Sequence, residues 1–550
     1  MSWISIVPPI VVFILGFVTK RICFSLFTGV ALAALIATGG DPIGTGFLVF
    51  QGIWENTAIQ QAFSTATFGQ ASNFFIVTFV LSLGVIIEII RQSHAANAFV
   101  DFVEASIKSK RSAETSTIIL SHCLSIDDYL SSLTVGSVMR PLTDRFRIPR
   151  VKLAFLTDSM AAPLSMITPI SSWAAAIIGF LTENGVHRTL QSGTLLVANP
   201  YSVYLSILPY IFYSISLIIS VWFIVRLRLS FSIMNDHEEI AEQTGNLAGG
   251  KPTGDHHTEK NSSTSHSASI IDFLVPTGTL MISTLVFLLY LGESTLFGGT
   301  NSMVEALQNA PISLVLFSSG MTTLSITITY FLIKGRFTFY EILRVGYEGV
   351  RLMFPVAAIL VLSWTMGELL REHLKTGEWL ASLFAGSIPV MLIPLILFWN
   401  AALISLALGS SWATTAILLP IALPMVMAMM NVTAPAQIEQ LPIVFPVFGA
   451  ILSGAVCGDH ISLISETTIM ATTSAMCDHM DHVKTQLVYS IPVIIGSSLA
   501  FLASGVMLGA DTTLSLIVCM SISVVTTLSI LTMLHLYWKH SRKQQTLEQL

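Results

Sequence analysis

The chain has 550 residues, of which 53% are hydrophobic and only 11% are charged, and its mean hydropathy is +0.75. Soluble domains carry about a quarter charged residues, so this composition excludes a soluble globular protein. The net charge of −6 decides little, because in a membrane protein the placement of Lys and Arg matters more than their sum. The five scattered cysteines include no CxxC motif and argue against a disulfide framework.

Apolar runs long enough to cross a bilayer recur along almost the whole chain. In the first half we expect helices near 3–19, 22–38, 72–91, 152–180 and 202–226, with a polar, interrupted segment at 112–141. Lys20 and Arg21 follow the first apolar run instead of preceding it, so this run is expected to remain as a membrane helix. Basic clusters flank the segment 112–141 on both sides, which indicates a re-entrant hairpin entered from the cytoplasm.

A polar stretch divides the membrane portion into two parts. Residues 230–269 are rich in acidic, His, Gly, Ser and Thr residues, a composition that predicts a flexible polar cytoplasmic linker. It separates a first transmembrane repeat, 1–229, from a second, 270–510. In the second repeat we expect helices near 270–290, 311–333, 351–370, 443–480 and 487–509 and a hairpin within 379–430. Residues 511–550 are expected to form an extra C-terminal helix and a basic cytoplasmic tail.

The two halves share an ordered set of motifs. Glu88 and Arg91 align with Glu368 and Arg371, and each pair follows a Val-Leu-Ser tripeptide. The loop after the first helix is basic, whereas its counterpart at 291–310 has no Lys or Arg. Positive residues mark the cytoplasmic side, so equivalent loops lie on opposite faces. The predicted fold is an all-α integral membrane protein with two inverted-topology repeats, each with a re-entrant hairpin and a broken helix. About 11 crossings would place the N-terminus outside and the C-terminus in the cytoplasm.

Inverted repeats with interrupted helices are typical of secondary transporters, whose sites form where broken segments meet. Four polar segments are expected to interrupt helices here, at 121–134, 157–172, 409–415 and 458–468. Carboxylates inside a membrane are costly and indicate function, and carboxylate, hydroxyl and freed carbonyl oxygens suit hard cations. The candidate ion- and proton-binding residues are Asp127, Asp128, Ser131, Asp158, Ser159, Ser410, Ser411, Thr414, Asp459, Ser462 and Glu466. Asp459, Ser462 and Glu466 are predicted to share one helical face.

Residues at the edges of these segments are candidates for gating or proton access: Arg140, His460, Asp478 and His479. Arg140 either closes the hairpin at the cytoplasmic surface or releases a proton from a nearby acid. The run from Cys477 to His482 contains zinc-ligand types, but consecutive residues cannot all surround one ion. We expect it to form a solvated helix end, with zinc binding as the weaker alternative. Glu88 with Arg91, and Glu368 with Arg371, are expected to form interfacial ion pairs.

At these motifs the chain resembles the NhaC-type sodium/proton antiporter family over nearly all of both halves. The similarity lies in the stretches 127–141, 158–173, 409–420 and 458–482. The resemblance implies exchange of Na⁺ for H⁺. We expect the protein to lie in a bacterial inner membrane and to need no cofactor, with Asp128, Asp158 and Asp459 as the sodium ligands. The family also includes exchangers that couple such gradients to malate and lactate. The chain departs from the family pattern at Ser131, where many relatives have Asn, and at Glu466, where Asp is usual.

The expected mechanism is competition between sodium and protons for the three aspartates, with one repeat-derived bundle moving against the remainder. No GxxxxGK[ST] motif occurs, so ion gradients are expected to supply the energy. The main alternative is a sodium- or proton-coupled exchanger of a small organic anion or an amino acid. A membrane enzyme is disfavoured, because GxGD and HExxH motifs are absent. The expected partners are the lipid bilayer and small ions, not nucleic acid, and a homodimer is compatible with the sequence.

Overall fold

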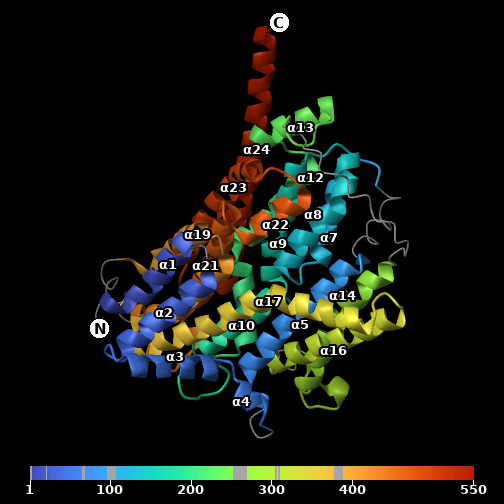
Figure 1. Ribbon diagram of the computed structural model, residues 1–550. Coiled ribbons are helices and arrows are strands. Elements are labelled where there is room, and N and C mark those ends of the chain that lie inside the picture. Colours follow the sequence, from blue (N-terminus) through green and yellow to red (C-terminus); the bar gives the residue numbers. More distant parts are fainter. Residues whose placement is uncertain are drawn as a thin grey trace.

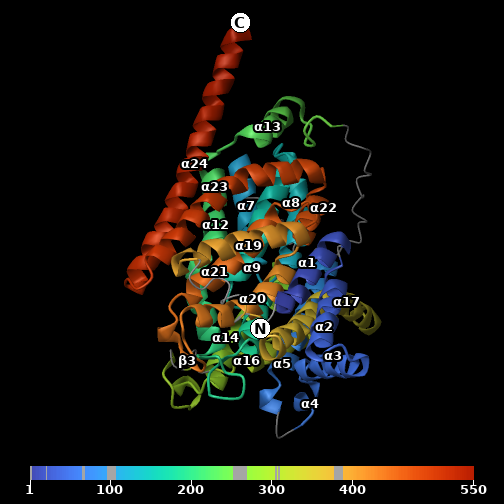
Figure 2. The same ribbon diagram turned by 90° about the vertical axis from the view of Figure 1, so that its left-hand side faces the viewer.

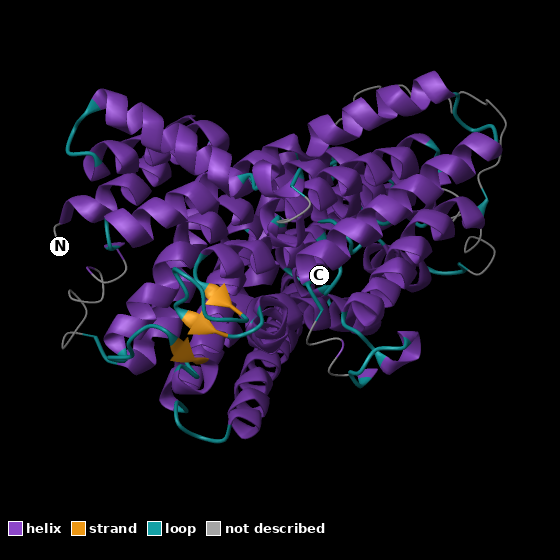
Figure 3. Ribbon diagram, turned by 90° about the horizontal axis from the view of Figure 1, so that it is seen from below, coloured by secondary structure: helices purple, strands orange, loops and turns teal. Residues whose placement is uncertain are grey.

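The computed structural model describes residues 3–19, 21–64, 68–95, 107–251, 269–303, 306, 310–376, 379 and 388–549. Nearly all of these residues are helical (Figure 1), which confirms the predicted all-α class. Strands appear in one small parallel sheet of order β1-β2-β3 (Figure 3). Its strands are β1 (Val186–His187), β2 (Leu196–Val197) and β3 (Ala436–Gln437).

The helices alternate between long apolar segments and shorter elements. Up to residue 229 they are α1 (Val7–Thr19), α2 (Ile22–Ala37), α3 (Pro42–Asn56), α4 (Ile59–Ala62), α5 (Ser72–Gln92), α7 (Lys110–Cys123), α8 (Asp128–Arg145), α9 (Arg150–Ile167), α10 (Ser172–Glu183), α11 (Pro200–Ile207) and α12 (Phe212–Leu227). After it they are α13 (Ser232–Thr244), α14 (Ile270–Leu291), α16 (Ile312–Ile333), α17 (Phe339–Glu368), α19 (Ile393–Leu408), α20 (Ser411–Met429), α21 (Val444–His460), α22 (Glu466–Ala475), α23 (His479–Val506) and α24 (Thr512–Gln549). Single 3₁₀ or π turns occur at Trp3–Ile6, Phe68–Gln70, Leu208–Tyr210, Thr295–Phe297, Leu369–His373, Val390–Leu392 and Ile438–Gln440.

The described residues contain 9 helices that are long and apolar enough to cross a membrane. The number is 10 if α9 and α10, which meet at 46°, form one broken span. Helices α2 and α21 are apolar but shorter. The chain is therefore a multi-pass helical membrane protein. The inverted relation of the two repeats and the expected domain boundaries stay predictions.

All four polar segments interrupt helices, as the sequence predicted. The breaks lie between α7 and α8, α9 and α10, α19 and α20, and α21 and α22. A polar side chain caps each new helix by accepting a hydrogen bond from a backbone N–H of its first turn. The capping residues are Asp127, Ser171, Ser410 and Ser465. The predicted broken helix at 443–480 is divided into α21, α22 and the start of α23.

Two glycines let α21 approach α19 closely. A Cβ on Gly454 would lie 2.3 Å from the carbonyl oxygen of Phe398, and a Cβ on Gly458 would lie 2.1 Å from that of Ala402. The four-residue spacing places both glycines on one face of α21, so the two backbones touch. Small residues at such intervals are typical of packed membrane helices. This contact fixes the position of Asp459, the next residue in the chain.

Helix α13 lies at the end of the molecule from which α24 projects, opposite α4 (Figures 1 and 2). A flexible linker was predicted for 230–269, and this is wrong for residues 232–244; residues 252–268 lie outside the described part. The buried ammonium of Lys152 in α9 pairs with Glu114 at 3.0 Å and with Glu238 of α13. Composition cannot show such a contact, because Lys152 and Glu238 lie 86 residues apart.

Candidate functional site

Two threonines in the first turn of α22 reach carboxylates from two other helices. Thr467 Oγ1 donates to Asp459 Oδ2 at 2.7 Å, and Thr468 Oγ1 donates to Asp158 Oδ2 at 3.1 Å. Asp158 lies in the middle of α9 and is 0% exposed, and Asp459 lies at the end of α21 and is 2% exposed. The structure therefore brings two of the three predicted sodium ligands to the start of one short helix.

Asp158 has a second partner that the sequence analysis did not identify. His482 Nε2 lies 3.0 Å from Asp158 Oδ2, and both side chains are 0% exposed. Among the described residues, Asp158 Oδ1 has no hydrogen-bond partner. A buried polar atom without a partner calls for a ligand or a water molecule. The free oxygen of Asp158 is thus available to an ion inside the protein.

The neighbouring acids Asp127 and Asp128 hold different partners. Asp127 accepts hydrogen bonds from the backbone N–H of Leu130 at 2.9 Å and from Ser172 Oγ at 2.8 Å. Both of its oxygens are occupied in capping α8 and joining it to α10. Asp128 Oδ2 accepts from Trp173 Nε1 at 2.9 Å, and its Oδ1 accepts from the N–H of Tyr129 at 3.1 Å.

Asp128 belongs with the two acids beside α22. Helices α8, α9 and α21, which carry Asp128, Asp158 and Asp459, all contact α22. All three side chains are at most 2% exposed. We call Asp128, Asp158 and Asp459 the carboxylate cluster.

Two identical Ser-Ser-Trp tripeptides begin α10 and α20, at 171–173 and 410–412. The rings of Trp173 and Trp412 pack against each other with centroids 4.2 Å apart and planes inclined at 30°. Trp173 also donates to Asp128, so this ring contact connects α20 with the carboxylate cluster.

The hydroxyls of the Ser410 segment, by contrast, make bonds within their own helix. Ser410 Oγ accepts from the N–H of Ala413 at 3.3 Å, and Thr414 Oγ1 donates to the carbonyl of Ser410 at 2.9 Å. The carbonyl of Ser411 accepts a similar bond from Thr415 Oγ1 at 2.9 Å. The contacts of Ser410, Ser411 and Thr414 therefore account for capping and give no link to the carboxylate cluster.

The predicted common face of Asp459, Ser462 and Glu466 is wrong, because α21 ends at His460 and a turn follows. Ser462 Oγ donates to the carbonyl of Leu406 at 2.8 Å, on α19. Glu466 is exposed and accepts a hydrogen bond from Tyr129 OH at 2.6 Å. Ser462 thus supports the turn, and Glu466 lies outside the enclosed cluster.

Three further candidates are buried near the carboxylate cluster. Ser131 Oγ and His460 Nε2 have no hydrogen-bond partner among the described residues. His460 Nδ1 lies 3.4 Å from Tyr213 OH. Ser159 Oγ accepts from Gln486 Nε2 at 3.0 Å. Ser131 and His460 therefore keep polar atoms available, whereas Ser159 joins α9 to α23.

The run 477–482 begins α23 and is divided between two surroundings. Asp478 caps α23 at the surface, where the N–H of Asp481 and the ammonium of Lys251 hold the pKa of its carboxyl below the usual value. His479 Nε2 lies 2.8 Å from the carbonyl of Leu463. His482, in contrast, faces Asp158. The expected solvated helix end holds for Asp478 and is wrong for His482, one helical turn further along.

Arg140 donates to the carbonyl of Ser474 at 3.1 Å and lines a cavity of about 880 Å³ between α5, α8, α17 and α22. The predicted pair of Glu88 and Arg91, in the same cavity, is confirmed at 2.5 Å. The predicted pair of Glu368 and Arg371 is not formed. Glu368 instead accepts from Asn56 Nδ2 at 2.8 Å, and Arg371 Nε donates to Glu372 at 3.0 Å.

Residues 166–506 match the Na⁺/H⁺ antiporter family. An uncharacterized protein of Haemophilus influenzae is 32% identical over 503 residues, which is 91% of this chain and 90% of that protein. The malate-2H⁺/Na⁺-lactate antiporter of Bacillus subtilis is 31% identical over 167 residues, which is 30% of this chain and 31% of that protein.

Two solved structures are also similar. The YdaH transporter of Alcanivorax borkumensis has a TM-score of 0.41 at 15% identity, covering 85% of this chain and 89% of that one. MtrF of Neisseria gonorrhoeae, described as illuminating a class of antimetabolite efflux pumps, has a TM-score of 0.42 at 10% identity, covering 94% of each chain.

Proposed function

Because the chain belongs to the Na⁺/H⁺ antiporter family, we propose that this secondary transporter exchanges sodium ions for protons through its carboxylate cluster. The observation that carries the proposal is the pairing of Asp158 with His482 at 3.0 Å, both fully buried, while the second oxygen of Asp158 lacks a partner. One oxygen thus faces a group that can carry a proton, and the other is available to a cation.

The oxygen atoms around α22 suit a sodium ion. Hard cations prefer carboxylate, hydroxyl and carbonyl oxygens. Asp158 and Asp459 supply the carboxylates, and the hydroxyls of Thr467 and Thr468 have lone pairs left after donating to them. Sodium is cargo here, and no resident cofactor is proposed.

Exchange follows from the cost of burying uncompensated charge. The cluster has three carboxylates, and His482 pairs with one of them, Asp158. Ionised and empty, the cluster is negative, and an isolated charge in a low-dielectric interior is strongly unfavourable. A sodium ion or protons must therefore neutralise the cluster before it changes sides. Because both ions use the same oxygens, the arrival of one promotes the release of the other.

We place the α13 end of the molecule in the cytoplasm of a bacterial cell, with the protein in the inner membrane. Arg147 Nη1 donates to the carbonyl of Glu242, and the N–H of Arg150 donates to the carbonyl of Leu247. The α8–α9 loop and the end of α12 thus gather arginines beside α13, and basic loops mark the cytoplasmic side. The N-terminus is expected outside.

Exchange of an organic anion is the second candidate function. Arg140, Arg91 and Arg351 line the cavity of about 880 Å³, which reaches Leu130 and Thr134 of α8. Guanidinium groups recognise carboxylates, and one relative is named as a malate-2H⁺/Na⁺-lactate antiporter. An organic acid bound in this cavity would lie beside the first turns of α8, close to Asp128.

The proposal is tested in proteoliposomes that hold a pH gradient reported by an internal dye. Addition of sodium is expected to dissipate the gradient, and Asp158→Asn is expected to remove the response. Asp511→Asn is the matched control, because Asp511 is exposed and only caps α24. Lithium, potassium, malate and lactate are added separately. A response to malate or lactate without any alkali cation would favour the second candidate and contradict the first.

A further inference from the structure

A second polar cavity lies at the α4 end of the molecule, away from the carboxylate cluster. It has a volume of about 470 Å³ and is lined by Asn56, Glu183 and Glu368. Asn56 ends α3 and Glu183 ends α10, whereas Glu368 lies where α17 continues into the π turn Leu369–His373. Helix C-termini carry partial negative charge, so the ends of α3 and α10 favour a cation in this cavity.

Hydrogen bonds connect Glu368 with two buried asparagines. Asn56 Nδ2 donates to Glu368 Oε2 at 2.8 Å, and Asn73 Nδ2 donates to the backbone carbonyl of Asn56 at 3.0 Å. Glu183 lines the same cavity as Asn73 and Glu368. The cavity therefore brings two carboxylates together with Asn73, and the bonds of Glu368 leave further oxygen lone pairs open.

The charges of this cavity do not balance. Glu55, Glu183, Glu368 and Glu372 line it, and its lining contains one guanidinium, that of Arg371. This guanidinium already donates to Glu372 and to the backbone carbonyl of Glu183. The carboxylates of Glu183 and Glu368 therefore keep negative charge that Arg371 does not neutralise by direct contact.

An unpartnered amide oxygen is the independent sign of a ligand. Asn73 is 5% exposed and lines the cavity, and its Oδ1 has no hydrogen-bond partner among the described residues. A buried carbonyl oxygen without a donor is costly. A cation held by this oxygen and the two carboxylates would satisfy all three, since these are the oxygen types that hard cations prefer.

We propose that Glu183, Glu368 and Asn73 form a second alkali-cation site, separate from the carboxylate cluster. Glu183 ends α10, whereas Trp173, which donates to Asp128, lies near its start. Their separation of ten positions along α10 corresponds to about 15 Å of helix. The role of this site is to load cations from the α4 side before they reach the carboxylate cluster. This role rests on the proposed sodium exchange.

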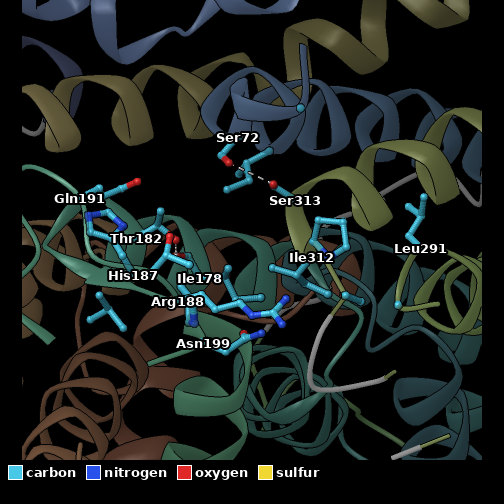
Figure 4. Close-up of a pocket in the computed structure, with 18 of the residues that line it drawn as sticks. Ser72, Ile178, Thr182, His187, Arg188, Gln191, Asn199, Leu291, Ile312 and Ser313 are labelled. Atoms are coloured by element: carbon cyan, nitrogen blue, oxygen red, sulfur yellow. Dashed lines mark hydrogen bonds between the residues drawn. The ribbon is translucent and has the colours of Figure 1, made fainter. Parts of the chain in front are cut away.

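The site has a polar approach from the same end of the molecule. A neighbouring cavity of about 610 Å³ shares Ser72, Thr182, His187 and Gln191 with it. Figure 4 shows these four side chains in that neighbouring cavity, with Ser72 hydrogen-bonded to Ser313. A hydrated cation would thus pass polar side chains before it meets the two glutamates.

Binding of ²²Na⁺ to the purified full-length protein tests this inference. The wild type is expected to bind two ions, and Glu183→Gln and Glu368→Gln are each expected to bind one. Glu55→Gln is the matched control, because Glu55 lines the same cavity but is exposed. Monodisperse elution and an unchanged melting temperature establish that each variant is folded. Two separate variants are made so that the inference is still tested if one of them does not fold.

The outcomes separate this inference from the proposed function. If Glu183→Gln and Glu368→Gln bind as the wild type does while Asp158→Asn loses one ion, the second site is overturned and the exchange site stands. If Asp158→Asn keeps both ions, the proposed function fails instead. Exchange is also measured with sodium added on one side of the membrane at a time. When sodium is added on the α4 side, Glu183→Gln is expected to raise the sodium concentration for half-maximal exchange about tenfold. An equal increase from the α13 side would contradict the loading role.

Discussion

At the scale of single residues, Asp127 and Asp128 are adjacent in the chain but differ in what their carboxylates bind. Asparagine caps helices about as well as aspartate, so Asp127→Asn is expected to keep α8 capped and to retain most of the exchange. Asp128→Asn and Asp459→Asn are each expected to abolish exchange without loss of membrane insertion. Transport rates per inserted protein measure the difference. Equal loss in Asp127→Asn and Asp128→Asn would mean that the capping role is misassigned.

The sequence identifies some of these residues and not others, for a physical reason. Asp158 and Asp459 stand out because an acid within an apolar run is expensive and therefore rare. His482 does not, because its partner Asp158 is 324 residues away and its neighbours in the chain are polar. Thr467 and Thr468 lie within the predicted polar segment 458–468, but the sequence does not single out their hydroxyls. Only the position of α22 beside α9 and α21 shows that their hydroxyls reach the acids.

At the scale of helices, the four interruptions could be predicted because Pro, Gly and Ser-rich stretches disfavour a continuous helix. The helical structure of α13 could not be predicted, because it depends on the contact between Lys152 and Glu238, which are far apart in the chain. The exact start of α22 is likewise set by Ser465, whose side chain accepts a hydrogen bond from the N–H of Thr468.

The contact between α19 and α21 gives a prediction for this scale. In Gly458→Val, the new side chain would meet the Ala402 carbonyl at 2.1 Å, and overpacking of this kind costs about 3 kcal/mol. We expect a clearly lower melting temperature. The control is Gly278→Val on α14, because a Cβ there meets nothing within 4 Å. Equal melting temperatures for the two variants would show that the helices are not in backbone contact.

The buried ion pairs of α13 give another prediction. Lys152→Met leaves Glu114 and Glu238 without their cation, and breaking a buried pair costs about 3–5 kcal/mol. We expect a lower melting temperature and faster proteolysis near residue 245. Lys110→Met is the control, since Lys110 pairs with the exposed Glu242 and surface pairs contribute about 0–1 kcal/mol. If both variants melt alike, Lys152 does not hold α13 in place.

At the scale of the whole molecule, the placement of α13 in the cytoplasm can be checked by labelling. Thr244 is exposed at the α13 end, and Leu190, 69% exposed, lies in the loop beside the cavities at the opposite end. In a background without native cysteines, Thr244→Cys is expected to react with an impermeant maleimide only in inverted vesicles. Leu190→Cys is expected to react only in right-side-out vesicles. The reverse pattern would invert the topology.

The central claim is that sodium and protons compete for the same buried carboxylates. The most direct test is the dissociation constant for ²²Na⁺ measured across pH on the purified protein. If each sodium ion displaces one proton, this constant rises about tenfold for each unit of acidification in the range where the cluster takes up protons. Asp158→Asn should remove the ion bound at the carboxylate cluster, together with the pH dependence of that ion's binding. A dissociation constant that stays the same at every pH would contradict the account.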